Sequence, residues 1–87
     1  MISSGEPRIL GQHTGMITAV ALASDAQLAL SASNDKTLKI WDVKHCQHVA
    51  TFTVEYPLQC CTFAPNGRTI AAGDSFGNVH ILRLQAE

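Results

Sequence analysis

Three residues in the first half of the chain have the types of a hydrolase triad: His13, Ser31 and Asp35. In such a triad the histidine takes the proton of the serine hydroxyl, and the carboxylate orients the histidine. The chemistry also needs an exposed serine, an oxyanion hole and a surface that binds the substrate. No segment of this short chain is left over to form that surface. We therefore expect no catalytic residues, and a small enzyme that uses His13 and Ser31 remains an alternative.

A second group of side chains has the chemistry of a metal or redox centre, namely His45, Cys46, His48, Cys60, Cys61 and His80. Zinc binds Cys and His at short, regular spacings, but no standard finger spacing and no Cys-x-x-Cys pair occurs here. The cysteines are three, an odd number, and the adjacent Cys60 and Cys61 would point to opposite faces of a strand. We expect no metal site and no disulfide framework, which favours a reducing, cytoplasmic compartment.

The composition limits the elements that can position these residues. The chain has 87 residues, of which 46% are hydrophobic and 15% charged, and its formal net charge is −1. This length allows one small domain with a marginal core, and the charge balance lacks the basic excess of a nucleic-acid binder. The longest nearly apolar run, 16–23, is far shorter than the roughly 18 residues of a membrane span. We therefore expect neither nucleic acid nor a membrane as a partner.

The sequence contains an internal repeat. Shifted by 41 positions, Leu22 falls on Phe63 and Ile40 on Ile81, and apolar segments and turns recur in the same order. The pattern predicts strands over residues 17–22, 28–33, 37–42, 48–52 and 79–84. No stretch keeps the apolar period of a helix. Short strands at such close, regular intervals are typical of an all-β sandwich, barrel or propeller.

Two short motifs select one of these architectures. Leu10-Gly11-Gln12-His13 stands before the first predicted strand, and Trp41-Asp42 closes the third. This pattern resembles a WD repeat, the blade unit of β-propellers, which a Gly-His-like pair opens and a Trp-Asp pair closes. The resemblance implies an all-β fold of about two four-stranded antiparallel WD-repeat blades, an incomplete propeller. It covers nearly the whole chain, which looks like the C-terminal end of a longer WD-repeat protein.

The resemblance also divides the chain into three parts. Residues 1–12 would hold strand d of a preceding blade at Arg8–Leu10. Residues 13–52 would form a well-matched blade, and residues 53–87 a degenerate repeat that lacks its last strand.

The same resemblance gives the triad-like residues a structural role, together with the tryptophan, as a hydrogen-bonded tetrad of His13, Ser31, Asp35 and Trp41. Asp35 would accept from turn amides and from one imidazole nitrogen. The other imidazole nitrogen of His13 would form a hydrogen bond with the Ser31 hydroxyl. That hydroxyl would also bond to the Trp41 N–H, a donor that needs a partner when buried. Such a network is worth more intact than in parts.

The second repeat departs from this pattern. Val54 stands at the position of the histidine, Phe76 at that of the turn aspartate, and Leu82-Arg83 at that of the Trp-Asp pair. A turn position that is Gly77 in the second repeat is Lys36 in the first. Since glycine is the residue that best tolerates a positive φ, we expect Lys36 in the left-handed region.

The function implied by the resemblance is that of a non-enzymatic scaffold segment that mediates protein–protein interaction, with no cofactor. Its partners would be other proteins or peptides, and either the missing propeller blades or further copies of the chain. Candidate contact residues are Tyr56 and Phe76, because aromatic side chains near a loop rim are enriched among interface hot spots. Met16 is a third candidate, because it lies beside the His13 loop, where propellers of this family often bind on one face.

Three further alternatives remain open. Residues 72–84 are similar to the terminal blade of regulatory ATPases, so the chain could close the sensor propeller of a nucleotide-binding ATPase. It could also be a truncated product with no independent function, since repeat architectures usually need three or more units. The third alternative is the Cys/His metal or redox module described above.

Overall fold

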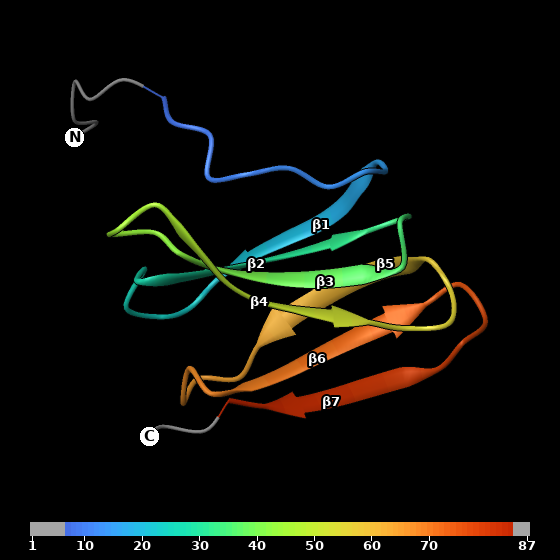
Figure 1. Cartoon of the computed structure of the whole chain (residues 1–87). Helices are drawn as coiled ribbons and strands as arrows, with labels where there is room; N and C mark the ends of the chain where they lie inside the picture. The colour runs from blue at the N-terminus through green and yellow to red at the C-terminus, as the bar shows by residue number, and fades with distance from the viewer. Residues whose placement is uncertain (1–6, 85–87) are drawn as a thin grey trace.

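The computed structural model describes residues 7–84, and these residues fold into strands and turns without a helix (Figure 1). The strands are β1 (Ile17–Leu22), β2 (Leu28–Ser33), β3 (Thr37–Asp42), β4 (Gln47–Thr53), β5 (Leu58–Phe63), β6 (Thr69–Asp74) and β7 (Val79–Arg83). They form two antiparallel sheets with the orders β1-β2-β3-β4 and β5-β6-β7. The predicted all-β class of incomplete propeller blades is confirmed. No helix of the described part is long and apolar enough to cross a membrane.

Asx turns join the first two strands of each sheet. The Asp25 carboxylate accepts from the amide of Gln27 at 3.0 Å. In the second sheet the Asn66 side-chain oxygen accepts from the amides of Arg68 at 2.8 Å and Thr69 at 3.1 Å. Side chains of this type favour turns because they bond to the backbone two residues on, so these residues fix where β1 and β5 reverse direction.

Positive backbone φ angles occur at repeat-equivalent turn positions. Lys36 has φ 71° and Gly77, its equivalent in the second repeat, has φ 86°. Ala26 and Gly67, a second equivalent pair, have φ 60° and 69°. The prediction for Lys36 is confirmed, and the first repeat places non-glycine residues where the second uses glycine, the residue that adopts this region without steric cost.

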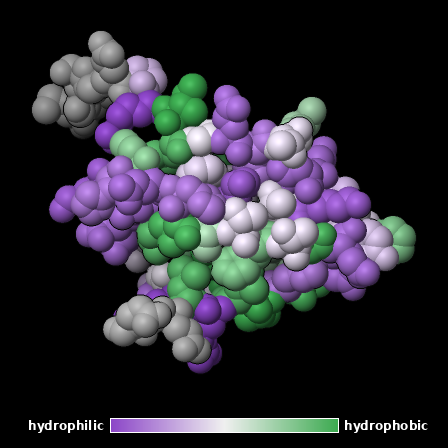
Figure 2. All heavy atoms as spheres, viewed as in Figure 1, coloured by the Kyte–Doolittle hydropathy of each residue, from purple (hydrophilic) through white to green (hydrophobic). Residues whose placement is uncertain are grey.

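The two sheets pack as layers around one apolar core, with the β1–β4 sheet above the β5–β7 sheet in Figure 1. The fully or nearly fully buried members of this core are Leu30, Ala32, Leu38, Ile40, Leu58, Ile70 and Ala72. A hydrogen bond also crosses between the layers, because the Thr18 hydroxyl donates to the carbonyl of Leu58 at 2.7 Å. At the surface, apolar side chains emerge among hydrophilic ones in several places (Figure 2).

The segment before β1 is not a strand in this structure. Arg8–Leu10 lies outside both sheets, although this stretch was expected to be strand d of a preceding blade. A strand is defined by its pairing, and the described residues contain no blade that could supply a partner. Gly11 of this segment lies against the indole of Trp41, and a β-carbon built on it would come within 2.4 Å of that ring. The assignment to a preceding blade stays a prediction, and the ends of the predicted divisions, 1–6 and 85–87, lie outside the described residues.

Candidate functional site

The structure brings three of the four predicted tetrad residues into one chain of hydrogen bonds across the first sheet. Trp41 Nε1, near the end of β3, donates to Ser31 Oγ on β2 at 2.9 Å. Ser31 Oγ lies 2.6 Å from Nε2 of His13, which precedes β1. The Ser31 hydroxyl is therefore placed between an indole donor and an imidazole nitrogen.

Asp35 completes the network from the turn between β2 and β3. Its Oδ2 lies 3.1 Å from His13 Nδ1 and accepts from the amide of Thr14 at 3.0 Å. Its Oδ1 accepts from both the amide and the hydroxyl of Thr37. Because a carboxylate only accepts, His13 Nδ1 carries the proton, so Nε2 accepts from the Ser31 hydroxyl.

Hydrogen bonding dominates the electrostatics of Asp35. Burial would raise the pKa of this carboxyl, but the hydrogen bonds from Thr37, His13 and Thr14 outweigh it and hold the pKa well below the ordinary value. The side chains of His13 and Asp35 are only 1% and 8% exposed. Asp35 is therefore a buried anion whose charge is met by several donors at once.

The same geometry bears on the hydrolase alternative. Ser31 is 4% exposed, and its Oγ is already engaged by Trp41 and His13. A serine nucleophile must be open to a substrate and face an oxyanion hole. In the described structure the arrangement instead ties the segment before β1, the middle of β2, the β2–β3 turn and β3 together.

Sequence reasoning missed a second carboxylate centre, Asp74, at the end of β6. Its oxygens accept from the amides of Phe76 at 2.9 Å and Asn78 at 3.0 Å, and its Oδ2 lies 2.9 Å from His80 Nε2. Burial raises its pKa, yet the bonds from His80, Asn78 and Phe76 together lower it to about 2. The repeat comparison pointed to Phe76, because Phe76 is the repeat equivalent of Asp35; the turn carboxylate comes instead from a position slightly earlier in the chain.

Two of the three predicted contact residues lie together. The rings of Tyr56 and Phe76 stack with centroids 4.2 Å apart and planes 7° apart. Phe76 remains 73% exposed, and Met16 is 72% exposed. Met16 precedes β1, Tyr56 precedes β5 and Phe76 lies in the β6–β7 turn, so all three are at the same end of the strands, on the right in Figure 1. We call Met16, Tyr56 and Phe76 the aromatic rim.

The histidines and cysteines do not converge. His45 Nδ1 lies 2.9 Å from the Asp42 carboxylate, and His48 Nε2 lies 2.7 Å from the Thr51 hydroxyl. Burial raises the pKa of the Cys61 thiol to about 11. Between residues 7 and 84, no group of three or more His, Cys, Asp or Glu side chains is arranged to hold a metal ion.

Comparison with known proteins agrees with this architecture. The family described as the TEP-1 C-terminal beta-propeller matches residues 13–84. Periodic tryptophan protein 2 of Arabidopsis thaliana is 38% identical over 75% of this chain and 8% of its own length. The small ribosomal subunit protein RACK1 of Schizosaccharomyces pombe is 27% identical over 86% of this chain and 24% of its own length. The target of rapamycin complex subunit LST8 of Mus musculus is 27% identical over 99% of this chain and 28% of its own length.

Proposed function

The chain belongs to the WD-repeat β-propeller proteins, with the TEP-1 C-terminal β-propeller as its matching family, and we propose that it acts as a non-enzymatic scaffold segment that binds other proteins. It spans between 8% and 28% of the length of the relatives named above, so the proposal concerns this segment and its surfaces. The names of two relatives, a ribosomal subunit protein and a target of rapamycin complex subunit, support a place in a multiprotein assembly. We place that assembly in the cytoplasm.

The observation that carries the proposal is the stacked pair in the aromatic rim. An aromatic side chain that is 73% exposed and stacked on a second ring offers a rigid apolar surface at low entropic cost. Aromatic anchors of this kind are enriched among the few residues that dominate interface energies. We propose that the rim takes an apolar or aromatic side chain of a partner protein or peptide.

The tetrad has a supporting role in this proposal. Because His13, Ser31, Asp35 and Trp41 join the segment before β1 to β2, the β2–β3 turn and β3, we assign them to holding the first blade rigid. Residues 13–52 are accordingly assigned to one WD-repeat blade, and residues 53–87 to a degenerate repeat. Met16 connects the rim to the tetrad through Ser33. The Met16 carbonyl accepts from the Ser33 hydroxyl at 2.9 Å, and that hydroxyl oxygen accepts from the Asp35 amide at 3.0 Å, while the Met16 side chain stays exposed.

A displayed peptide library tests the rim. We expect peptides with an aromatic or aliphatic anchor to be enriched on the wild-type chain and to bind Phe76→Ala more than about 10-fold more weakly, the loss of a hot-spot contact. Val49→Ala is the matched control, because Val49 is 53% exposed on β4 and lies outside the rim. No enrichment on the wild type, or equal losses in Phe76→Ala and Val49→Ala, would contradict the proposal.

A further inference from the structure

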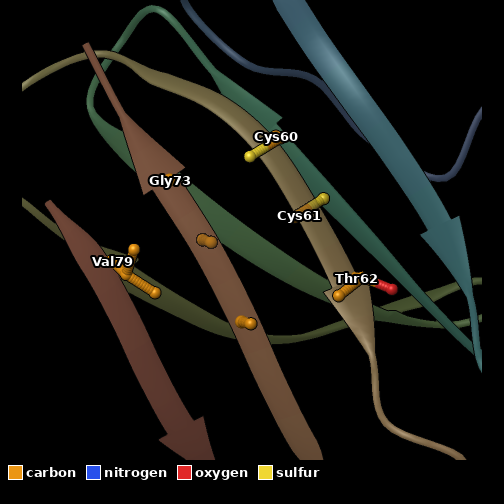
Figure 3. Close-up of a pocket in the computed structure, with 7 residues that line it drawn as sticks. Cys60, Cys61, Thr62, Gly73 and Val79 are labelled. Atoms are coloured by element: carbon orange, nitrogen blue, oxygen red, sulfur yellow. The ribbon is translucent and has the colours of Figure 1, made fainter. Parts of the chain in front are cut away.

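The outer face of the second sheet has an apolar hollow of about 200 Å³ (Figure 3). Its wall follows two cross-strand rows, in which directly paired residues point to the same side. One row is Cys60, Gly73 and Val79; the other is Thr62 and Ala71, and Ile81, which pairs with Ala71, continues that row beyond the hollow. Val79 is 75% exposed and Ile81 is 64% exposed. This tail face therefore leaves two large aliphatic side chains beside a floor of small residues.

The tail face is the repeat equivalent of a surface that is already covered in this structure. Moved back by 41 positions, the two rows become Ala19, Ala32 and Leu38, and Ala21, Leu30 and Ile40, which are rows of the first sheet. Those residues pack against the second sheet in the common core. The established contact between the two sheets thus shows what kind of surface the tail face fits, namely the opposite face of a blade.

The chain carries such a face on the outer side of its first sheet. The row Val20, Ser31 and Lys39 is the repeat equivalent of Cys61, Ala72 and His80, which face the core from the second sheet. On this head face Val20 is 63% exposed and Leu22 is 59% exposed. The head face and the tail face are the two outer faces of a stack of two sheets, so they cannot meet within one chain.

The side-chain sizes of the two faces are complementary. In the core, large Leu30 on β2 belongs to the same packed cluster as small Cys61 on β5. At the outer faces the sizes are exchanged, because the tail face has Ala71 where the first sheet has Leu30, and the head face has Val20 where the second sheet has Cys61. Cores tolerate exchanges that conserve total volume.

The open strand edge adds a second match. Within residues 7–84, β7 pairs only with β6, whereas its equivalent β3 pairs with both β2 and β4. Moved back by 41 positions, the residues of β4 fall on the segment before β1, so that Ala50 and Phe52 correspond to Ile9 and Gly11. Ile9 is 82% exposed. An unpaired edge and an unpaired extended segment can satisfy one another's backbone groups.

We propose that a second copy of this chain stacks head to tail on the first, with its head face on the tail face. In this arrangement residues 7–12 of the second copy become the fourth strand beside β7. By the register of β3 with β4, Ile9 of the second copy lies opposite Ile81 and Gly11 lies opposite Val79. Each junction leaves a head and a tail free, so copies add until a ring closes; rings of roughly four to eight blades correspond to about two to four copies. This association does not depend on the aromatic rim.

Sedimentation velocity on the full chain over a range of concentrations tests the stacking. We expect wild-type chains to form species of about two to four copies. Val79→Asp blocks the tail face and Val20→Asp blocks the head face, and each should weaken association at least about 100-fold because a carboxylate would be buried without a partner. Both side chains are exposed in the single chain, so circular dichroism of each variant should keep the strand signal.

Mixing the two variants separates head-to-tail stacking from other modes. Each variant keeps one intact face, so an equimolar mixture should form a dimer of one Val79→Asp and one Val20→Asp chain and nothing larger. Phe76→Asp, a matched change at an exposed rim residue, should associate like the wild type. Ile9→Pro removes a backbone donor from the segment without touching either sheet, and should weaken association through the strand edge alone.

Any one of several results would overturn the proposal. They are a wild-type chain that stays monomeric at every concentration, a variant mixture that stays monomeric, an association that Phe76→Asp abolishes, and an association that Ile9→Pro leaves unchanged. If Val20→Asp alone abolished association while Val79→Asp had no effect, the contact would be symmetric through the head face, and head-to-tail stacking would also be wrong.

Discussion

At the scale of single residues, buried polar groups in this chain are placed so that each has a partner. In the described part of the chain, no buried side-chain nitrogen or oxygen lacks a hydrogen bond. This matters because an unpaired buried donor or acceptor costs about 1–3 kcal/mol, whereas an average satisfied hydrogen bond contributes about 1 kcal/mol net. The residues around Ser31 and Asp35 should therefore be sensitive to the loss of any one partner.

His13 offers the most direct test of that sensitivity. His13→Ala would leave Ser31 Oγ and the Asp35 carboxylate each without one buried partner, and we expect the free energy of unfolding to fall by about 1–3 kcal/mol. Chemical unfolding followed by circular dichroism measures this. His45→Ala is the control, because the His45 side chain is 62% exposed and its bond to Asp42 is a surface interaction that contributes little. Equal effects of the two substitutions would rule out the structural role of the tetrad.

The two turn carboxylates predict the direction of acid sensitivity. The folded pKa of Asp74 is about 2, against an ordinary value of 3.8, and that of Asp35 is also depressed. A depressed folded pKa stabilises the fold above the ordinary pKa, and this contribution is lost as the pH falls toward the folded value. We expect the unfolding midpoint to decline between about pH 4 and pH 2. In Asp74→Asn the unfolding midpoint should depend less steeply on pH over this window. An unchanged slope would mean that Asp74 does not contribute to the acid sensitivity.

At the scale of elements, the strands of the first sheet could be predicted because turn-forming residues mark where each strand ends. Residues 17–22, 28–33 and 37–42 were expected as strands and coincide with β1, β2 and β3. The fourth was expected over 48–52 and β4 extends it by one residue at each end. The second sheet repeats these features. Burial alternates along β6, and Asn66 forms an Asx turn at the position equivalent to Asp25 in the first sheet.

Two features of the candidate site could not be predicted from the sequence: the source of the turn carboxylate in the second sheet and the stacking of Tyr56 on Phe76. Comparing the repeats position by position matched Phe76 with Asp35, but Asp74 reaches the turn amides from an earlier position, at the end of β6. A one-dimensional comparison has no signal for such an exchange. Stacking of Tyr56 on Phe76 is likewise a contact between two separate loops, and only the fold brings them together.

The turns of the first repeat carry a testable strain. Lys36 has φ 71°, and the left-handed region costs a non-glycine residue roughly 1–2 kcal/mol. Glycine avoids this cost, but it loses more conformational entropy on folding, which offsets about 0.5–1 kcal/mol of the gain. We expect Lys36→Gly to raise the free energy of unfolding by about 0.5–1 kcal/mol. Lys44→Gly, at a turn position that does not itself have a positive φ, should lower it by a similar amount. Urea unfolding of both variants measures these changes. A lower free energy of unfolding in Lys36→Gly would show that the backbone of Lys36 is not strained.

At the scale of the whole molecule, one core serves both sheets. Residues of β2 and β3 on one side and of β5 and β6 on the other belong to a single buried cluster, and the bond from Thr18 to the Leu58 carbonyl crosses between them. The largest buried aliphatic side chains of both sheets all belong to this cluster, namely Leu30, Leu38, Ile40, Leu58 and Ile70. We therefore expect the sheets to unfold together, since each one loses its buried face when the other opens.

A substitution in one sheet, observed from the other, tests this coupling. Ile70 on β6 is fully buried, so Ile70→Ala should cost about 2–5 kcal/mol. The single tryptophan, Trp41, lies on β3 of the other sheet. If the sheets unfold as one unit, the fluorescence midpoint of Trp41 and the circular dichroism midpoint shift together in this variant. Met16→Ala, at a side chain that is 72% exposed, should move neither. A circular dichroism shift without a tryptophan shift would mean that the first blade is stable without the second, because only a first sheet that folds alone could keep Trp41 buried while β6 is lost.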